Sequence, residues 1–326
     1  MEIFRKMSLA DSTGDAIPFY HEGKYHIFSL TSPPGTTVYP ERLRTTWSHS
    51  VSEDLVHWKE LPTALYPGEG EEPDASGVWT GSVIYGEGQF HAFYTGYCLT
   101  AEFQQTICHA TSEDGITWKK DTANPVITPI TELYEKLDWR DPYVFYNEED
   151  ENYWILISAR RLDMPITRRG CIVLYRSKDL KNWSYYGPIY SPGHTNCPEC
   201  PEMYRMGNHW YLSYSRFSEF VNTIYRVSES PFGPWRKPKK DGIGGRRFYA
   251  AKSMQNEEGR RFYFGWAHDR AQQSDTGEWY WGGTFCVPHE VVPSENGELD
   301  VKLPREYEQI FGRKTEWEYL PVLGDA

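Results

Sequence analysis

The 326-residue sequence lacks the features that mark several large classes of protein. No apolar run approaches the length of a transmembrane helix, and the N-terminal MEIFRKMSLA has no apolar core long enough for a secretory signal. The net charge is −12 and no long basic run is present, which argues against nucleic acid or an anionic membrane as partner. We therefore expect a cytoplasmic protein that binds neither.

Cysteine is also scarce for the length of the chain. The six residues are Cys98, Cys108, Cys171, Cys197, Cys200 and Cys286. So few in so long a chain do not indicate a disulfide framework. Cys197 and Cys200 have CxxC spacing, but no second pair or histidine partner follows at zinc-finger distance, and no βαβ pattern surrounds them. We expect no metal site and no cofactor.

Aromatic residues and chain-breaking residues are abundant. Aromatics make up 16% of the chain, with 13 Trp and 24 Tyr, and it contains 27 Gly and 22 Pro. This mixture favours many short strands joined by frequent turns, with most aromatics packed in cores and some exposed as platforms that stack on sugar rings.

One pattern recurs five times: an apolar strand, a tight turn with Gly or Asn, and a second strand rich in aromatics. The copies are IPFYHEGKYHIFSL (17–30), SVIYGEGQFHAFYTGY (82–97), PYVFYNEEDENYWILISAR (142–160), PEMYRMGNHWYLSYSR (201–216) and SMQNEEGRRFYFGWAHD (253–269). Alternating hydrophobicity around such turns predicts a β-hairpin in each case.

A second pattern follows four of these hairpins: a strand ending in Ser or Thr, then an acid, then Trp. The tryptophans are Trp58, Trp118, Trp183 and Trp235, at spacings of 60, 65 and 52 residues. A period of that size, built from two hairpins, corresponds to one four-stranded sheet per repeat. We predict an all-β fold, a five-bladed β-propeller with a central funnel-shaped active site. It would form one domain over 1–326, with 312–326 as a tail.

One alternative fold and one expected helix accompany this prediction. A two-sheet β-sandwich is the second choice, although it would not explain the repeated acid–Trp pattern. Helix is expected to be rare, with Thr131–Leu137 as one short helical segment that Thr131 would cap.

The repeat also indicates where chemistry would occur. Asp15 lies 10 residues before Tyr25, Asp141 lies 12 before Tyr153, and Glu199 lies 11 before Trp210. These counts place three carboxylates at equivalent positions in blades 1, 3 and 4, at the entrance of the innermost strands. We therefore expect their side chains to converge in one funnel, with Arg140 beside Asp141.

Clustered carboxylates of this kind suit glycoside hydrolysis. One must be protonated to give a proton to the leaving oxygen, and one must be ionised to attack the anomeric carbon. Like charges close together raise one pKa, and a third carboxylate offsets positive charge on the ring at the transition state.

Several segments resemble glycoside hydrolase family 32, the invertase, inulinase and levanase family. They are WSHSVSEDLVHWKELPTALYP (47–67), WTGS (79–82), FYTG (93–96), WRDP (139–142), CPECPEMY (197–204), FYAAKSM (248–254), FGWAHD (264–269) and WGGTFCVPHEV (281–291). The resemblance implies a transition-state stabiliser at Asp141 and an acid/base at Glu199. It does not include the family's β-sandwich after the propeller, so either the propeller is self-sufficient or homo-oligomerisation covers that surface.

The nucleophile region departs from the family pattern, which is usually Asn-Asp-Pro-Asn-Gly. Here the chain reads Ser-Thr-Gly-Asp-Ala-Ile-Pro over 12–18, and Asp15 is the expected nucleophile, with Asp11 as the fallback. The residues expected to bind substrate are Trp47, Trp79, Ser82, Arg140, Tyr249, Lys252 and Trp281.

The leading hypothesis is a retaining β-fructofuranosidase acting on an oligosaccharide or small glycoside. A related propeller that inverts configuration on arabinose- or xylose-containing glycans is the alternative, and carboxyl separation would discriminate the two. A non-catalytic sugar-binding propeller is the third hypothesis.

Overall fold

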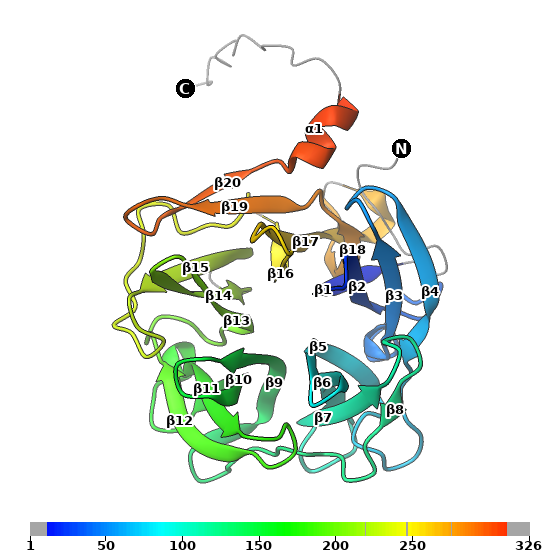
Figure 1. Cartoon of the computed structure of the whole chain (residues 1–326). Coiled ribbons are helices and arrows are strands. Elements are labelled where there is room, and N and C mark those ends of the chain that lie inside the picture. Colours follow the sequence, from blue (N-terminus) through cyan, green and yellow to red (C-terminus); the bar gives the residue numbers. More distant parts are fainter. Residues whose placement is uncertain (1–11, 219, 246, 275, 312–326) are drawn as a thin grey trace, which may run out of the picture.

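The computed structural model describes residues 12–218, 220–245, 247–274 and 276–311. Their sheets surround a central region instead of stacking as two layers (Figure 1). The strands of the first half are β1 (Thr13–His21), β2 (Lys24–Thr31), β3 (Thr46–Ser52), β4 (Trp58–Leu65), β5 (Gly77–Gly86), β6 (Gln89–Tyr97), β7 (Gln105–Ser112), β8 (Lys119–Lys120), β9 (Tyr134–Asn147) and β10 (Asn152–Arg161). The all-β class is confirmed.

The second half of the chain continues the same architecture. Its strands are β11 (Gly170–Ser177), β12 (Ser184–Tyr190), β13 (Glu199–Met206), β14 (His209–Arg216), β15 (Asn222–Ser228), β16 (Tyr249–Gln255), β17 (Arg261–Arg270), β18 (Trp279–Phe285), β19 (His289–Pro293) and β20 (Leu299–Lys302). The helical pieces are three 3₁₀ turns, Glu41–Leu43, Ile166–Arg168 and Ala271–Gln273, and the short helix α1 (Arg305–Phe311). The predicted tail over 312–326 lies outside the described residues.

All five predicted hairpins are confirmed. They are the antiparallel pairs β1–β2, β5–β6, β9–β10, β13–β14 and β16–β17. Their first strands lie nearest the centre (Figure 1). The described strands form four sheets, because a pairing of β1 with β18 joins the first and last units into one of nine strands. The count of five blades therefore stays a prediction.

The acid–Trp pattern marks the turn between the third and fourth strands of a unit. The Asp114 carboxylate accepts hydrogen bonds from the backbone N–H groups of Ile116 and Thr117, and Asp54 and Asp179 accept the equivalent pairs. In these three of the four copies, an Asp side chain thus satisfies the backbone amides of a tight turn.

The predicted helix at Thr131–Leu137 is wrong. Thr131, Glu132 and Leu133 form a turn, and Tyr134 begins β9, whose outer part pairs with Arg161 of β10. Local propensity is a weak guide over seven residues, and pairing with β10 overrides it here. In the part of the chain that the structure describes, no helix is long and apolar enough to cross a membrane.

The core is divided among clusters that lie between neighbouring sheets. One such cluster packs Trp139 of β9 and Ile155 of β10 against Phe93 of β6. Packing between sheets therefore holds the inner strands at fixed positions around the centre.

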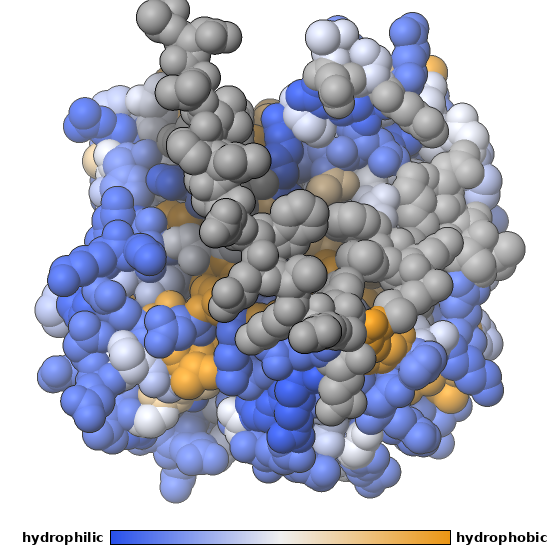
Figure 2. Space-filling view, turned by 90° about the horizontal axis from the view of Figure 1, so that it is seen from above, coloured by the Kyte–Doolittle hydropathy of each residue, from blue (hydrophilic) through white to orange (hydrophobic). Residues whose placement is uncertain are grey.

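The side of the molecule toward α1, β19 and β20 is mostly hydrophilic, with small hydrophobic areas (Figure 2).

Each inner strand carries a β-bulge, at which two of its residues face one residue of the partner strand. The two bulged residues are 14 and 15 in β1, 79 and 80 in β5, 141 and 142 in β9, 200 and 201 in β13, and 250 and 251 in β16. In three of them the first bulged residue has positive φ: Asp141 (58°), Cys200 (49°) and Ala250 (46°). Bulges redirect side chains, and here at least one bulged residue of each inner strand lines the same cavity.

Candidate active site

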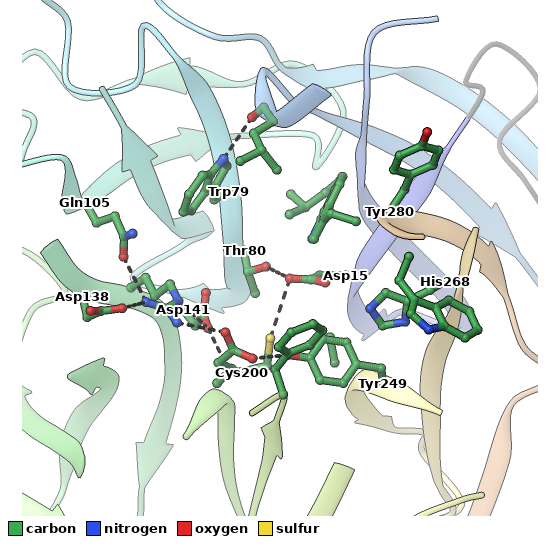
Figure 3. A pocket seen from close by; sticks show the side chains of 18 of the residues that line it. Asp15, Trp79, Thr80, Gln105, Asp138, Asp141, Cys200, Tyr249, His268 and Tyr280 are labelled. Atoms are coloured by element: carbon green, nitrogen blue, oxygen red, sulfur yellow. Dashed lines mark hydrogen bonds and ion pairs between the residues drawn. The ribbon is translucent and has the colours of Figure 1, made fainter. Parts of the chain in front are cut away.

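A cavity of about 430 Å³ opens at the level of the five bulges. Most of the predicted site residues line it, namely Asp15, Trp79, Arg140, Asp141, Glu199, Tyr249 and Trp281. They come from β1, β5, β9, β13, β16 and β18. The side chains of Asp15, Asp141 and Tyr249 point toward a common space (Figure 3). The structure thus brings together three carboxylates that are far apart in the sequence.

Three predicted substrate-binding residues do not line this cavity. Trp47 is fully buried and donates its indole N–H to the carbonyl of Trp79. Ser82 donates to the Pro142 carbonyl and accepts from the Val144 N–H. Lys252 lies below the floor, where it donates to a backbone carbonyl. These residues support the cavity wall, because their alternation along the strands turns them away from it.

The three acids do not occupy equivalent positions, so the predicted register is wrong. Asp15 is the second bulged residue of β1, Asp141 is the first of β9, and Glu199 precedes the bulge of β13. Counting back from the second strand failed because the turn of β9–β10 is longer than those of β1–β2 and β13–β14, and because the bulge of β1 lies farther along its strand from the residue paired with the reference aromatic than the bulges of β9 and β13 do. The carboxylates converge because the bulges turn these consecutive positions toward the same cavity.

Asp15 is held by donors from three other strands. Its Oδ1 accepts the indole N–H of Trp266 at 2.8 Å, and its Oδ2 accepts the hydroxyl of Thr80. The thiol of Cys200 lies 3.7 Å from Oδ2. Burial raises the pKa of Asp15 above its ordinary value of 3.8, against the hydrogen bonds from Thr80 and Trp266. Asp11, the fallback nucleophile, lies outside the described residues.

Asp141 lies beside Arg140 and Cys200. Its Oδ2 accepts the Cys200 backbone N–H at 2.9 Å and lies 3.7 Å from Nε of Arg140. Its own N–H donates to the hydroxyl oxygen of Thr95, which fixes the strained residue in place. Burial raises the pKa of Asp141, and the positive charge of Arg140 opposes that rise.

Glu199 faces the cavity between a cation and a phenol. Its Oε1 accepts Nη2 of Arg140 at 2.9 Å, and its Oε2 accepts the hydroxyl of Tyr249. Its side chain keeps 23% of its surface exposed, against 6% for Asp141. Burial raises the pKa of Glu199, and Arg140 and Tyr249 act in the opposite direction. Glu199 is therefore the more accessible of these two carboxylates.

Arg140 is shared among several acceptors. Besides Glu199 and Asp141, its guanidinium donates to Asp138 at 2.5 Å and to Gln105 at 3.2 Å, and its Nη2 lies 3.3 Å from the thiol of Cys197. Cys197 and Cys200, the CxxC pair, are thus buried free thiols within the acid cluster. Burial raises the pKa of both thiols, which keeps them protonated.

Sequence reasoning missed several residues of the cavity. Those that line it are Leu30, Tyr39, Leu43, Thr80, Gln105, Asp138, Cys200, Phe217, Ala250, His268, Trp279 and Tyr280. Burial and the charge of Arg247 lower the pKa of His268 to about 4, so its imidazole is neutral near pH 7. The run Trp279–Trp281 was a usable signal, since three consecutive aromatics in one strand are rarely all needed for packing.

Gly14 fits Trp281 against β1. A Cβ at this position would lie 2.4 Å from Cζ2 of the Trp281 indole, closer than any ordinary contact. The indole therefore covers the strand directly beside Asp15. This contact explains why a glycine precedes Asp15 in segment 12–18, which differs from the usual family pattern.

The chain matches a family model described as the glycosyl hydrolases family 32 N-terminal domain over residues 14–302. It is 29% identical over 316 residues to raffinose invertase from Escherichia coli, covering 89% of this chain and 62% of that protein. It is 25% identical over 331 residues to sucrose-6-phosphate hydrolase from Zymomonas mobilis, and this match covers 94% of this chain and 62% of that protein.

Solved structures share the fold. The crystal structure of fructan 1-exohydrolase IIa from Cichorium intybus superposes with a TM-score of 0.76 at 24% identity, covering 94% of this chain and 61% of that one. The chain thus spans less than two thirds of the length of these relatives.

Proposed function

The chain belongs to glycosyl hydrolase family 32, and from that premise we propose that it hydrolyses fructofuranosides with retention of configuration. Relatives named as invertase, levanase and fructan 1-exohydrolase support a fructoside as substrate. We further propose a single propeller domain of five blades, in which the nine-stranded sheet comprises the first and last blades.

The observation that carries this proposal is the convergence of Asp15, Asp141 and Glu199 on one cavity, linked by Arg140 and Cys200. Three buried carboxylates near one guanidinium lower the stability of the fold, because burying a charge without its own partner costs free energy. Stability alone therefore does not explain why they are grouped. Their grouping is typical of a site that stabilises a cationic, oxocarbenium-like transition state.

In the proposed first step, an Asp15 oxygen attacks the anomeric carbon while Glu199 gives its proton to the leaving oxygen. A covalent fructosyl–enzyme forms and the leaving alcohol departs. Water then attacks the anomeric carbon as Glu199 takes its proton, and the bond to Asp15 breaks. Asp141 stays ionised and offsets the ring charge in both transition states, and Thr80 and Trp266 orient the nucleophile.

The proton is assigned to Glu199 because of its position. Asp15 is buried and bound by two neutral donors, whereas Glu199 keeps the exposure needed to reach a leaving group in the cavity. The hydroxyl of Tyr249 holds the carboxyl in that orientation.

Glu199→Gln tests the acid/base role. With sucrose, kcat should fall by about a hundredfold to ten-thousandfold, because the leaving oxygen loses its proton donor. With an aryl fructoside, whose leaving group needs little protonation, the fall should be far smaller. Equal losses on both substrates would show that Glu199 is not the donor.

The stereochemical outcome separates the proposal from its alternatives. Proton NMR of the first-formed product from sucrose, inulin or levan should show the anomer of the substrate. The inverted anomer, or turnover confined to arabinosides or xylosides, would contradict the fructosidase proposal. Sugar binding without turnover of any of these substrates would favour a non-catalytic propeller.

A further inference from the structure

Lys252 of β16 is a buried cation below the cavity floor. Only 1% of its surface is exposed. Its ammonium donates to the backbone carbonyl of Gly81 at 2.5 Å and lies 5.4 Å from the ring centre of Tyr143. No carboxylate oxygen of the described residues comes within 4.0 Å of it. A buried ammonium is costly without nearby negative charge, so its presence needs an explanation.

The charges around the centre form two layers. In the upper layer, at the cavity, four acids accompany one cation, Arg140; the acids are Asp15, Asp138, Asp141 and Glu199. In the lower layer, Lys252 and Arg261 accompany one carboxylate, Glu202, and all three line a second cavity of about 170 Å³. The upper layer is thus net negative when its acids are ionised, and the lower layer is net positive.

Glu202 already has its own partners. Both of its oxygens accept the backbone N–H of Ser253, and Oε2 also accepts the Ser253 hydroxyl. Arg261 donates to the Ser253 hydroxyl and to Gln255. The Lys252 charge opposes the burial that raises the pKa of Glu202, so Glu202 is one counter-charge of Lys252, and the acids at the cavity are the others.

We propose that Lys252 is a positioning residue for the acid cluster: its hydrogen bond fixes the β5 bulge that presents Thr80 to Asp15, and its charge favours the ionised form of Asp141. The inference rests on the proposed function for its effect on catalysis. The electrostatic coupling to Asp141 is measurable without turnover.

The geometry of β5 supports the first role. Gly81, whose carbonyl Lys252 binds, directly follows Thr80, whose hydroxyl donates to Asp15. A Cβ on Gly81 would lie 2.0 Å from the Phe93 carbonyl oxygen, so the strands approach closely here. Displacing Gly81 would move the Thr80 hydroxyl, and with it the orientation of the nucleophile.

The electrostatic surroundings support the second role. The Lys252 charge opposes the burial that raises the pKa of Asp141, and it acts in the same direction on the Cys200 thiol. The other titratable or charged groups that act on Asp141 are Asp15 from β1, Arg140 from β9, Glu199 and Cys200 from β13, and Cys197, which precedes β13. Of the cations, Arg140 is shared with Asp138 and Glu199, which leaves Lys252 as the cation on the opposite side of the floor.

Three substitutions separate the two roles. Lys252→Met removes both charge and donor, Lys252→Gln keeps a donor for the Gly81 carbonyl, and Lys252→Arg keeps the charge. We expect kcat on sucrose to fall by about tenfold to a hundredfold in Lys252→Met, less in Lys252→Gln, with KM little changed. Both neutral variants should move the acid limb of the kcat/KM profile to higher pH, and Lys252→Arg should restore it. Exposed Lys119→Met is the matched control.

A double-mutant cycle with Asp141→Asn gives a readout that needs no activity. At pH 7, Lys252→Gln should lower Tm more in the native background than in Asp141→Asn, because the neutral amide no longer needs the cation. That difference should vanish below pH 3.8, the ordinary pKa of Asp141, where the carboxyl is protonated in both states.

Additive Tm changes at pH 7, with unshifted pH–rate limbs, would overturn the inference. If the protein hydrolyses no fructoside but the cycle shows coupling, the proposed function fails and the positioning of Asp141 by Lys252 stands. If it hydrolyses fructosides and the cycle shows no coupling, the proposed function stands and the electrostatic role of Lys252 toward Asp141 is wrong.

Discussion

Ionised acids in the cavity lower the stability of the folded protein, although the proposed reaction requires them. Because burial raises the pKa of Asp15, ionising it costs more free energy in the folded chain than in the unfolded chain. Its contribution to stability is therefore fully present below pH 3.8, its ordinary pKa, and is lost as pH rises through the higher folded value. At neutral pH the folded protein bears that cost.

Asp15→Asn should consequently make the protein more stable and inactive. At pH 7 the free energy of unfolding should rise by on the order of 1 kcal/mol, since the buried charge is gone while the amide oxygen still accepts from Trp266 and the amide N–H donates to the Thr80 hydroxyl oxygen, which reverses that hydrogen bond. Near pH 3.5 the gain should disappear, because the native carboxyl is then protonated. Thermal unfolding at both pH values checks this, and an unstable variant at pH 7 would contradict it.

The same shifts determine the pH dependence of activity. We expect a bell-shaped kcat/KM profile whose acid limb lies above 3.8 and whose basic limb lies above 4.5, the ordinary values of Asp15 and Glu199. Interacting carboxylates titrate as a group, so each limb belongs to the cluster. Initial rates on sucrose at subsaturating concentration, from pH 3 to 9, measure both. An acid limb at or below 3.8 would contradict the role of burial.

At this scale the sequence motifs located the three acids and Arg140 but not the residues that orient them. Thr80 is 65 residues from Asp15 and Trp266 is 251 residues away, and no local pattern connects such positions. Trp47, Ser82 and Lys252 lie in matching motifs, yet their side chains face the packing side of the strands. Motif identity does not show which side of a bulged strand a residue faces.

Among the elements, hairpins were predictable because alternation and turn chemistry are local. All five formed as expected, whereas their mutual register did not follow from counting, because bulges and turn length shift it. The Asp turns are the most regular feature of the repeat, and the residue after each Asp has positive φ: Leu55 (66°), Gly115 (69°) and Leu180 (60°). The side-chain bonds to the backbone offset the strain of that conformation.

Asp114→Ala should therefore loosen the β7–β8 turn and lower the free energy of unfolding by about 1 kcal/mol at pH 7, as for loss of a helix cap. Backbone hydrogen bonds from Thr117 and Ile116 lower the pKa of Asp114 to about 2. Its stabilisation is present above pH 3.8 and is lost as pH falls through about 2. The difference in the free energy of unfolding between native and variant protein, measured by urea unfolding, should thus become smaller as the pH falls from 4 to 2.5. A gap independent of pH would indicate that the charge plays no part.

For the whole molecule, the critical joint is the one between the first and last units. The backbone register between β1 and β18 is limited to Thr13 with Gly283. Arg42 bridges the same joint from the 3₁₀ turn after β2: its guanidinium donates to the Trp281 and Thr36 carbonyls and to the Ser12 hydroxyl. Only 3% of this side chain is exposed, so no water replaces those bonds.

Arg42→Met should open this joint. Two carbonyls and a hydroxyl lose their donor inside the protein, which we expect to lower the free energy of unfolding by about 3 kcal/mol. The loss should be local: in hydrogen exchange, amides of β1 and β18 should exchange faster, while those of β10 and β11, on the far side of the ring in Figure 1, should keep their protection.

The matched control is Arg161→Met, which removes an arginine whose ion pair with Asp163 lies at the surface and should contribute little to stability. Faster exchange spread evenly over all sheets in Arg42→Met would mean that Arg42 contributes only to global stability. Exchange confined to β1 and β18 would identify the joint as the place where the ring opens first. Since β1 carries Asp15 and β18 carries Trp281, opening there would separate the proposed nucleophile from the indole that covers it.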